Sequence, residues 1–189
     1  MVASIAVGGD PQGGKGRGVL STANYAARAY GLKSAIPLRQ AWELSEAARK
    51  KGLPPVVFIS SGFRKYGETS KRIMAIVASH LEGTQTNLFE ETPPALEQVS
   101  VDECYFDLSF EGSFEKVRKV AERIKRDILM REKLTCSIGI GPNKLIAKIA
   151  SDFQKPDGLT IVPPEKVWDF LAPLPVRKIP GVGPKAEEK

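Results

Sequence analysis

SVDECYFD, at residues 100–107, is the stretch that decides the fold, because it places adjacent carboxylates between two apolar runs. Residues 96–101 and 104–108 predict two antiparallel strands joined by a tight turn at Asp102 and Glu103. Adjacent carboxylates repel each other unless a cation lies between them. Two Mg²⁺ ions, bridged by carboxylates and by nucleotide phosphates, would meet that need. The alternative is a solvated hairpin turn that binds no metal.

Strands and helices alternate on both sides of this hairpin. Short apolar runs predict strands, and helical periodicity predicts helices. The strands are predicted at residues 5–7, 56–59, 135–140 and 159–162, and the helices at 22–30, 37–51, 64–81, 114–130, 142–150 and 164–171. Residues 83–94 predict a loop. The pattern predicts an α+β fold in which helices back an antiparallel or mixed sheet.

The composition is that of a folded globular protein, with 42% hydrophobic and 26% charged residues in a chain of 189. No apolar run reaches the roughly 20 residues that cross a bilayer, and the chain shows no secretory pattern, so we expect a cytoplasmic protein without a membrane span. Cys104 and Cys136 lie far apart and His80 is the sole histidine, which excludes a structural zinc site. Both thiols are predicted to be reduced core residues.

The charge is unevenly distributed along the chain. Residues 1–80 hold 12 Lys and Arg against 4 Asp and Glu, and residues 116–189 hold 16 against 9. Residues 81–115 hold 9 Asp and Glu and no Lys or Arg. An acidic segment between basic flanks suits a polyanion held around a metal site, whereas the alternative is ordinary surface patchiness.

STANYAAR, at residues 21–28, predicts the start of a helix. Thr22 would lie where backbone N–H groups are unpaired and the helix dipole favours anions. Tyr25 and Arg28 are three residues apart and would project from one face, where they could hold a triphosphate. The alternative is that Thr22 only caps the helix and that Arg28 is a solvated charge.

Two further motifs lie near the end of the chain. Lys155 stands in a turn at residues 151–158, where its ammonium could donate to a phosphate; the alternative is an exposed loop lysine. IPGVGPK, at residues 179–185, spaces Gly181 and Gly183 so that backbone N–H groups could hold a DNA phosphate in a hairpin between short helices. The alternative is a frayed terminal turn.

A nucleotidase with a phosphate-binding loop is a competing hypothesis. GDPQGGKG, at residues 9–16, nearly fits the required pattern and follows a predicted strand. However, Gly16 stands where Ser or Thr would bind magnesium, and Gly18 interrupts any helix that follows.

In this order, the motifs TANYAAR, VDECYFD, CSIGIGPNKLIAKIASDFQKPDG and IPGVG resemble the Y-family translesion DNA polymerases, the DNA polymerase IV type in particular. The resemblance extends from residue 5 to residue 185 and implies DNA synthesis past lesions. It implies a fingers subdomain with an adjoining palm strand at residues 1–80 and the palm at 81–163. Residues 164–189 would begin a helix-hairpin-helix thumb.

The resemblance also implies roles for single residues and a set of ligands. Asp102 and Glu103 would be catalytic and would bind two Mg²⁺ ions. The residues expected at the nucleotide are Thr22, Tyr25, Arg28 and Lys155, and those expected at the DNA backbone are Gly181, Gly183 and Lys185. The expected partners are primer–template DNA, a dNTP and, through the C-terminal region that follows in the family, a sliding clamp. We expect a monomer.

The sequence departs from the family at its start. Family members begin with a strand that carries the first catalytic aspartate, followed by an aromatic residue that excludes ribonucleotides. Residues 1–9 match a later strand, and Asp10 lies in a glycine-rich loop, so we expect the first palm strand to be missing and the fold to be less stable. We therefore expect very weak incorporation in primer extension with Mg²⁺ and dNTPs, and clear template-dependent synthesis would contradict this. The alternative is a non-catalytic module that binds DNA or a partner protein.

Overall fold

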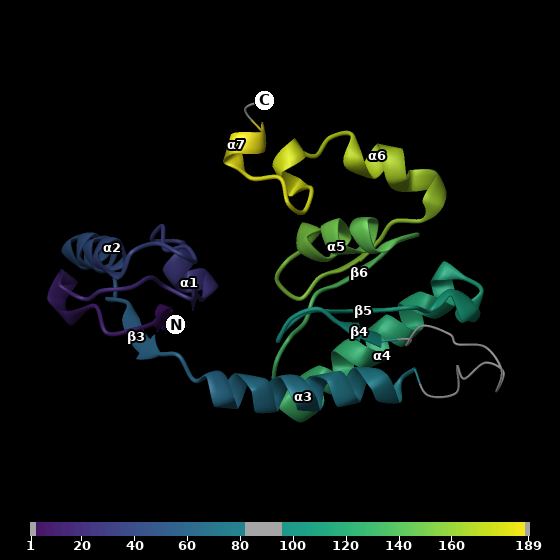
Figure 1. The fold of residues 1–189 in the computed structure, drawn as a ribbon, viewed down its shortest axis with the longest axis horizontal. Helices are drawn as coiled ribbons and strands as arrows, with labels where there is room; N and C mark the ends of the chain where they lie inside the picture. The colour runs from purple at the N-terminus through teal and green to yellow at the C-terminus, as the bar shows by residue number, and fades with distance from the viewer. Residues whose placement is uncertain (1–2, 82–95, 188–189) are drawn as a thin grey trace. The chain divides into compact units, whose positions relative to one another are not determined.

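The computed structural model describes residues 3–81 and 96–187, and the chain divides into two compact units, Met1–Arg64 and Lys65–Lys189 (Figure 1). Helices and several small sheets alternate along both units, which confirms the predicted α+β class. The loop predicted at residues 83–94 lies outside the described residues.

A three-stranded sheet organises the first unit. Its order is β2 (Thr22–Ala23), β1 (Ile5–Gly8) and β3 (Val57–Ser60), with β1 antiparallel to β2 and parallel to β3. Helix α2 (Leu38–Lys50) shares its core with this sheet. Four of the eight core residues are alanines, which lets the helices approach the strands closely. The core residues are Ala6, Leu20, Ala23, Ala27, Leu32, Leu38, Ala41 and Val56.

Ser45 joins α2 to the segment that enters β3. Its side chain is almost fully buried, and its Oγ accepts a hydrogen bond from the Val56 N–H at 2.9 Å. In a Ser45→Ala variant this N–H stays buried without an acceptor, so we expect unfolding free energy to fall by about 1–3 kcal/mol. Urea denaturation measures the change, with the exposed Ser34→Ala as the control. Equal midpoints for the two variants would contradict the prediction.

The helix predicted at residues 22–30 is shorter than expected, because Thr22 belongs to β2 and α1 spans only Tyr25–Arg28. Asn24, rather than Thr22, caps this helix. Its Oδ1 accepts hydrogen bonds from the N–H groups of Ala27 and Ile5, both at 3.0 Å. Its Nδ2 donates to the Ala3 carbonyl at 2.7 Å. The side-chain amide of Asn24 therefore lies where β2 ends and α1 begins, and its hydrogen bonds also join this point to the start of β1.

The second unit contains two separate two-stranded sheets that rest on the same helices. The hairpin is formed by β4 (Leu96–Gln98) and β5 (Cys104–Phe106), the parallel pair by β6 (Ile138–Ile140) and β7 (Leu159–Ile161), and the helices are α3 (Phe63–Ser79) and α4 (Phe114–Glu132). Buried residues of both helices form one core. Leu96 and Phe106 from the hairpin and Ile138 from β6 all pack against it.

The predicted hairpin is confirmed, with shorter strands than expected. The N–H groups of Val99 and Ser100 both donate to the Glu103 carbonyl, at 3.0 and 3.2 Å, so residues 99–103 form the loop between the strands. Cys104 is free, like Cys136, and burial raises the pKa of both thiols. Both cysteines were predicted to be core residues; each is instead partly buried and packs against the core of the second unit.

Helix α5 (Lys144–Phe153) packs on β6 and β7 and is followed by short elements. The predicted helix at 164–171 is a 3-10 turn, η3 (Pro164–Lys166), followed by α6 (Val167–Leu171). A further turn, η4 (Val176–Lys178), and α7 (Pro184–Glu187) flank the glycine motif. No helix in the described parts of the chain is long and apolar enough to cross a membrane.

Candidate functional site

The two predicted carboxylates lie in the hairpin loop and have different partners. Asp102 is exposed, and its Oδ1 accepts a hydrogen bond from the Ser100 hydroxyl at 2.8 Å. Glu103, whose side chain is 44% exposed, forms an ion pair through Oε1 with Nζ of Lys148 on α5. Both carboxylates therefore keep solvent-accessible surface on which a cation could bind.

Helix α5 faces the hairpin with a polar stripe formed by Lys144, Lys148 and Asp152. The spacing of four residues places the three side chains on one side of the helix. Lys144 forms an ion pair with Glu97 of β4, and its Nζ lies 5.7 Å from the ring centroid of Tyr105 in β5. The stripe thus fixes the hairpin against α5.

Four charges alternate from the hairpin loop to the turn after α5, and we call this series the ion-pair chain: Glu103, Lys148, Asp152 and Lys155. Asp152 lies 3.9 Å from Nζ of Lys148 and 2.5 Å from Nζ of Lys155. Burial lowers the pKa of Lys148, but the Glu103 hydrogen bond and the Asp152 charge outweigh it, so that pKa is raised. The structure thereby links two predicted site residues, Glu103 and Lys155.

Lys148 and Asp152 were not predicted to be site residues. They lie four residues apart on a helix whose other side is apolar, with Ile146 and Ala150 in the core. That pattern marks the polar side of α5. It does not identify the hairpin as the partner of that side, because the Lys148–Glu103 contact joins residues 45 positions apart.

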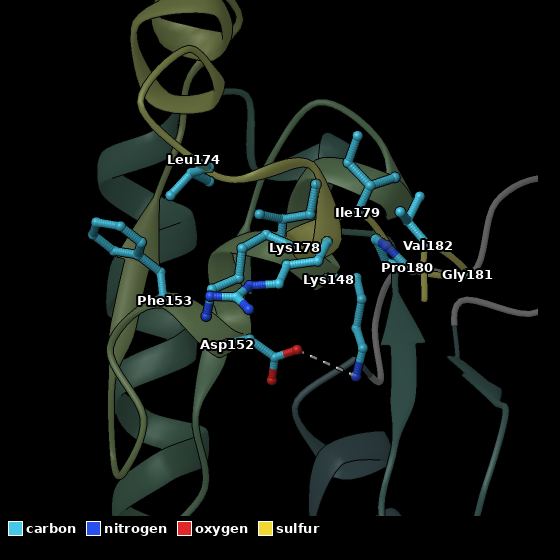
Figure 2. Close-up of a pocket in the computed structure, with 11 residues that line it drawn as sticks. Lys148, Asp152, Phe153, Leu174, Lys178, Ile179, Pro180, Gly181 and Val182 are labelled. Atoms are coloured by element: carbon cyan, nitrogen blue, oxygen red, sulfur yellow. Dashed lines mark ion pairs between the residues drawn. The ribbon is translucent and has the colours of Figure 1, made fainter. Parts of the chain in front are cut away.

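A pocket of about 320 Å³ lies beside the ion-pair chain. Figure 2 shows the Lys148–Asp152 ion pair next to the turn that carries Gly181 and Val182. The pocket is mainly apolar, with Arg177 and Lys178 as further cations. Its lining residues are Lys148, Ile149, Asp152, Phe153, Leu174, Arg177, Lys178, Ile179, Pro180, Gly181 and Val182.

The residues predicted to hold DNA lie on an exposed turn and on the short helix after it. Gly181 has φ +88°, which favours glycine, and a Cβ built at Gly181 or at Gly183 would meet no atom within 4 Å. Lys185 is exposed in α7. Open backbone and a nearby cation are compatible with the approach of a phosphate.

The residues predicted to bind a triphosphate from the first unit form an exposed cluster. The guanidinium carbon of Arg28 lies 5.1 Å from the ring centroid of Tyr25, and Nη2 of Arg28 donates to Oγ1 of Thr22 at 3.4 Å. Nε of Arg28 donates to the Ala23 carbonyl at 2.9 Å. Since α1 has only four residues, the expected contribution of a helix dipole is not available. The guanidinium alone supplies the positive charge.

No group of three or more His, Cys, Asp and Glu side chains that could hold a metal ion occurs among residues 3–81 and 96–187. Mg²⁺, however, is commonly bound by one or two carboxylates, with water and substrate phosphates as its other ligands. Asp102 and Glu103 fit that donor set. Lys148 would compete with a cation for Glu103.

The glycine-rich loop at residues 9–16 lacks the geometry of a phosphate-binding loop. The N–H groups of Gly14 and Gly16 both donate to the Pro11 carbonyl, at 2.8 Å each. Strand β2 follows, whereas a phosphate-binding loop leads directly into a helix. The nucleotidase hypothesis therefore has no structural support here.

Family models and curated relatives both match nearly the whole chain. Residues 3–152 match the impB/mucB/samB family, and residues 164–189 match the IMS family HHH motif. DNA polymerase IV 2 of Methanosarcina mazei is 46% identical over 185 residues, which cover 97% of this chain and 45% of that protein. DNA polymerase IV of Methanoculleus marisnigri is 45% identical, covering 97% and 46%. The chain thus spans about half the length of the curated relatives it matches.

Solved structures show the same similarity. DinB from Sulfolobus solfataricus aligns with a TM-score of 0.77 at 31% identity, over 98% of this chain and 48% of that one. An insertion ternary complex of Dbh DNA polymerase gives 0.77 at 32% identity, over 96% and 48%. A Y-family DNA polymerase chimera built with Dbh gives 0.75 at 32% identity, over 96% and 47%.

Proposed function

The chain belongs to the impB/mucB/samB family, and from that premise we propose that it forms the palm and fingers part of a DNA polymerase that copies past lesions. The observation that carries the proposal is the ion-pair chain, which links a hairpin carboxylate to a lysine in the turn after α5. In this proposal residues 1–80 form the fingers with a palm strand, residues 81–163 form the palm, and residues 164–189 begin the thumb.

The proposed chemistry is transfer of a nucleotide from a dNTP to a primer hydroxyl: the primer oxygen bonds to the α-phosphorus, pyrophosphate leaves, and the hydroxyl proton is released to solvent. Asp102 and Glu103 are the residues that would hold Mg²⁺, whose charge neutralises phosphate oxygens and lowers the pKa of an attacking hydroxyl. Lys155 would donate to a phosphate oxygen from the palm. From the fingers, Arg28 would pair with the triphosphate while Tyr25 contacts it.

The proposed partners follow from this chemistry. Primer–template DNA would meet the exposed backbone at Gly181 and Gly183 together with Lys185, and a dNTP would meet the Arg28 and Lys155 side chains. We further propose that the protein acts as a monomer in the cytoplasm and that a sliding clamp is a partner of the whole polymerase.

Lys148 is expected to weaken divalent-cation binding, because its ammonium occupies Glu103. In a Lys148→Met variant, Mn²⁺ should bind the hairpin loop about fivefold more tightly, the equivalent of about 1 kcal/mol for one partly exposed ion pair. Electron paramagnetic resonance of free Mn²⁺ measures the affinity. Lys144→Met is the matched control, because Lys144 pairs with Glu97, which is not one of the two carboxylates proposed to bind the metal. Unchanged affinity in Lys148→Met would show that the two cations do not compete.

A binding experiment tests the proposed function without requiring fast turnover. A fluorescent primer–template with a dideoxy-terminated primer is titrated with the chain, and anisotropy reports the affinity. With Mg²⁺ present, the dNTP that matches the template base should tighten the complex, and the three mismatched dNTPs should not. Affinity should also fall as salt rises, because phosphates are being neutralised.

The outcome separates the two functions that the sequence leaves open. A response to the matching dNTP alone supports a polymerase site. DNA binding with the same response to all four dNTPs supports a non-catalytic DNA-binding module, and the absence of salt-dependent DNA binding contradicts both.

A further inference from the structure

Lys125 of α4 directs its ammonium to the point where the parallel strands β6 and β7 begin. Its Nζ donates to the Cys136 carbonyl at 2.5 Å and to the Asp157 and Gly158 carbonyls at 3.0 and 3.3 Å. It also forms an ion pair with the Asp157 carboxylate at 2.5 Å. An ammonium has three N–H donors, and these protein acceptors can occupy all of them. The Lys125 side chain is accordingly only 17% exposed.

The apolar period of α4 explains this position. Ile124 and Ile128 belong to the buried core of the second unit. Lys125 directly follows Ile124, so its stem leaves the helix at the border of the buried face. A lysine can bury such a stem while its ammonium reaches polar groups beyond it. The acceptors of this ammonium stand just before the first residues of β6 and β7, Ile138 and Leu159.

The same ammonium holds one end of the turn that carries Lys155. We call residues 154–158, which connect α5 to β7, the Lys155 turn. The two ends of this turn are in close contact, because a Cβ built on Gly158 would lie 2.6 Å from the Gln154 carbonyl oxygen. Fixing Gly158 therefore also fixes the residues that precede it in the turn.

Asp157 gives the Lys155 turn a backbone conformation that requires outside support. Its φ is +56°, in the left-handed region, which costs free energy in any residue other than glycine. Such a conformation persists only where surrounding contacts hold it. The carbonyl and the carboxylate of Asp157 both accept from Lys125, which supplies these contacts.

We propose that Lys125 is a positioning residue for nucleotide binding, which holds the Lys155 turn so that Lys155 reaches the phosphates. This inference rests on the proposed function, in which Lys155 donates to a phosphate oxygen, and it identifies what fixes that lysine in place. The ion pair with Asp152 acts on the Lys155 side chain, whereas Lys125 acts on the backbone of the turn. Lys125 does not contact the nucleotide, because its donors are occupied by the protein.

The first test uses the anisotropy titration with primer–template and the matching dNTP. Lys125→Met keeps an apolar stem and removes the donors, so it should raise the dNTP concentration needed to tighten the complex about tenfold, the loss expected for one charged hydrogen bond. Lys125→Arg restores donors and should stay within about threefold of the unsubstituted chain. The control is Lys119→Met, because Lys119 lies on the same helix, is exposed and pairs with Glu115. It should leave the dNTP response unchanged.

A Lys155→Met background separates positioning from a general effect on stability. Lys155→Met alone should weaken the dNTP response about tenfold. Adding Lys125→Met should then change it less than about twofold, because the side chain through which Lys125 acts is gone. A further tenfold loss in the double variant would overturn the inference. An unchanged dNTP response in Lys125→Met alone would overturn it as well.

Amide hydrogen exchange examines the turn without nucleotide or DNA. The Gly158 N–H donates to Oγ of Ser137 at 3.1 Å. In Lys125→Met its exchange should accelerate about tenfold more than that of the Ile149 amide within α5, because only the turn loses its support. Equal acceleration at both amides would mean that Lys125 only stabilises the fold, and the inference would be wrong.

A milder variant keeps the test decisive if Lys125→Met does not fold. Asp157→Asn tolerates the left-handed backbone and removes only the charge of the ion pair, so the dNTP response should weaken, and exchange at Gly158 accelerate, about threefold each. No change in either would contradict the inference. If the unsubstituted chain does not respond to the matching dNTP while exchange at Gly158 accelerates in the variants, the proposed function fails and the restraint of the turn by Lys125 stands.

Discussion

The Gly139→Ala variant is expected to lose at least about 3 kcal/mol of unfolding free energy, a large share of the stability of a typical domain. An added Cβ would lie 2.0 Å from the Ala147 carbonyl oxygen, 2.3 Å from the Ser151 nitrogen and 2.9 Å from the Ala150 carbonyl carbon. All three are backbone atoms of α5, which cannot move aside as a flexible side chain would. Helix α5 must therefore shift away from β6.

Urea denaturation followed by circular dichroism measures this loss. Gly67→Ala is the matched control, because its Cβ would meet no atom within 4 Å and it lies inside α3. There the extra methyl should raise stability by up to about 1 kcal/mol through helix propensity. The free energy of unfolding should therefore fall in Gly139→Ala and rise in Gly67→Ala. A Gly139→Ala midpoint at or above that of the unsubstituted chain would show that α5 does not pack on β6 this closely.

The Asp102→Asn and Glu103→Gln variants are expected to lower nucleotide incorporation at least about a hundredfold each. Each variant removes a negative charge from the pair of carboxylates that would bind the metal together, and losing one member of such a pair removes most of the rate. Single-turnover primer extension with the protein in excess over DNA and with Mn²⁺ keeps a slow reference reaction measurable. Mn²⁺ binding at the hairpin loop should weaken in parallel. These losses follow from the proposed function and test its chemistry directly.

Glu97→Gln is the control for this pair of variants. Glu97 lies on the same hairpin, pairs with Lys144 and stands opposite Tyr105 in the ladder. Its loss should change incorporation only a fewfold. If all three variants retain the reference rate, the hairpin carboxylates do not bind the metal used in the reaction.

Local patterns predicted the helices with a strong apolar period. Helix α4 was expected at residues 114–130 and spans Phe114–Glu132, and its end coincides with Lys133 at φ +56°. The boundary between β2 and α1 was not predictable in the same way. It depends on the hydrogen bond from Ile5 to Asn24, which joins residues 19 positions apart.

The candidate site, too, was predictable only where a local sequence pattern specifies it. Asp102 and Glu103 stand out in the sequence because two adjacent carboxylates interrupt an apolar segment. Lys148 and Asp152 become site residues only when α5 packs beside the hairpin, and no local pattern specifies that packing. The acidic and basic segments of the sequence do meet here, through the pairs Lys148–Glu103 and Lys144–Glu97.

The bonding of Asn24 restricts which amino acids this position can accept. A helix cap ordinarily tolerates Ser, Thr or Asp as well as Asn, because each supplies an acceptor oxygen. Here the side chain must also donate to the Ala3 carbonyl, and an ionised Asp would place two acceptors against each other. A substitution that is conservative at most helix starts is therefore disruptive in this one, and a library of variants at this codon should retain asparagine almost alone.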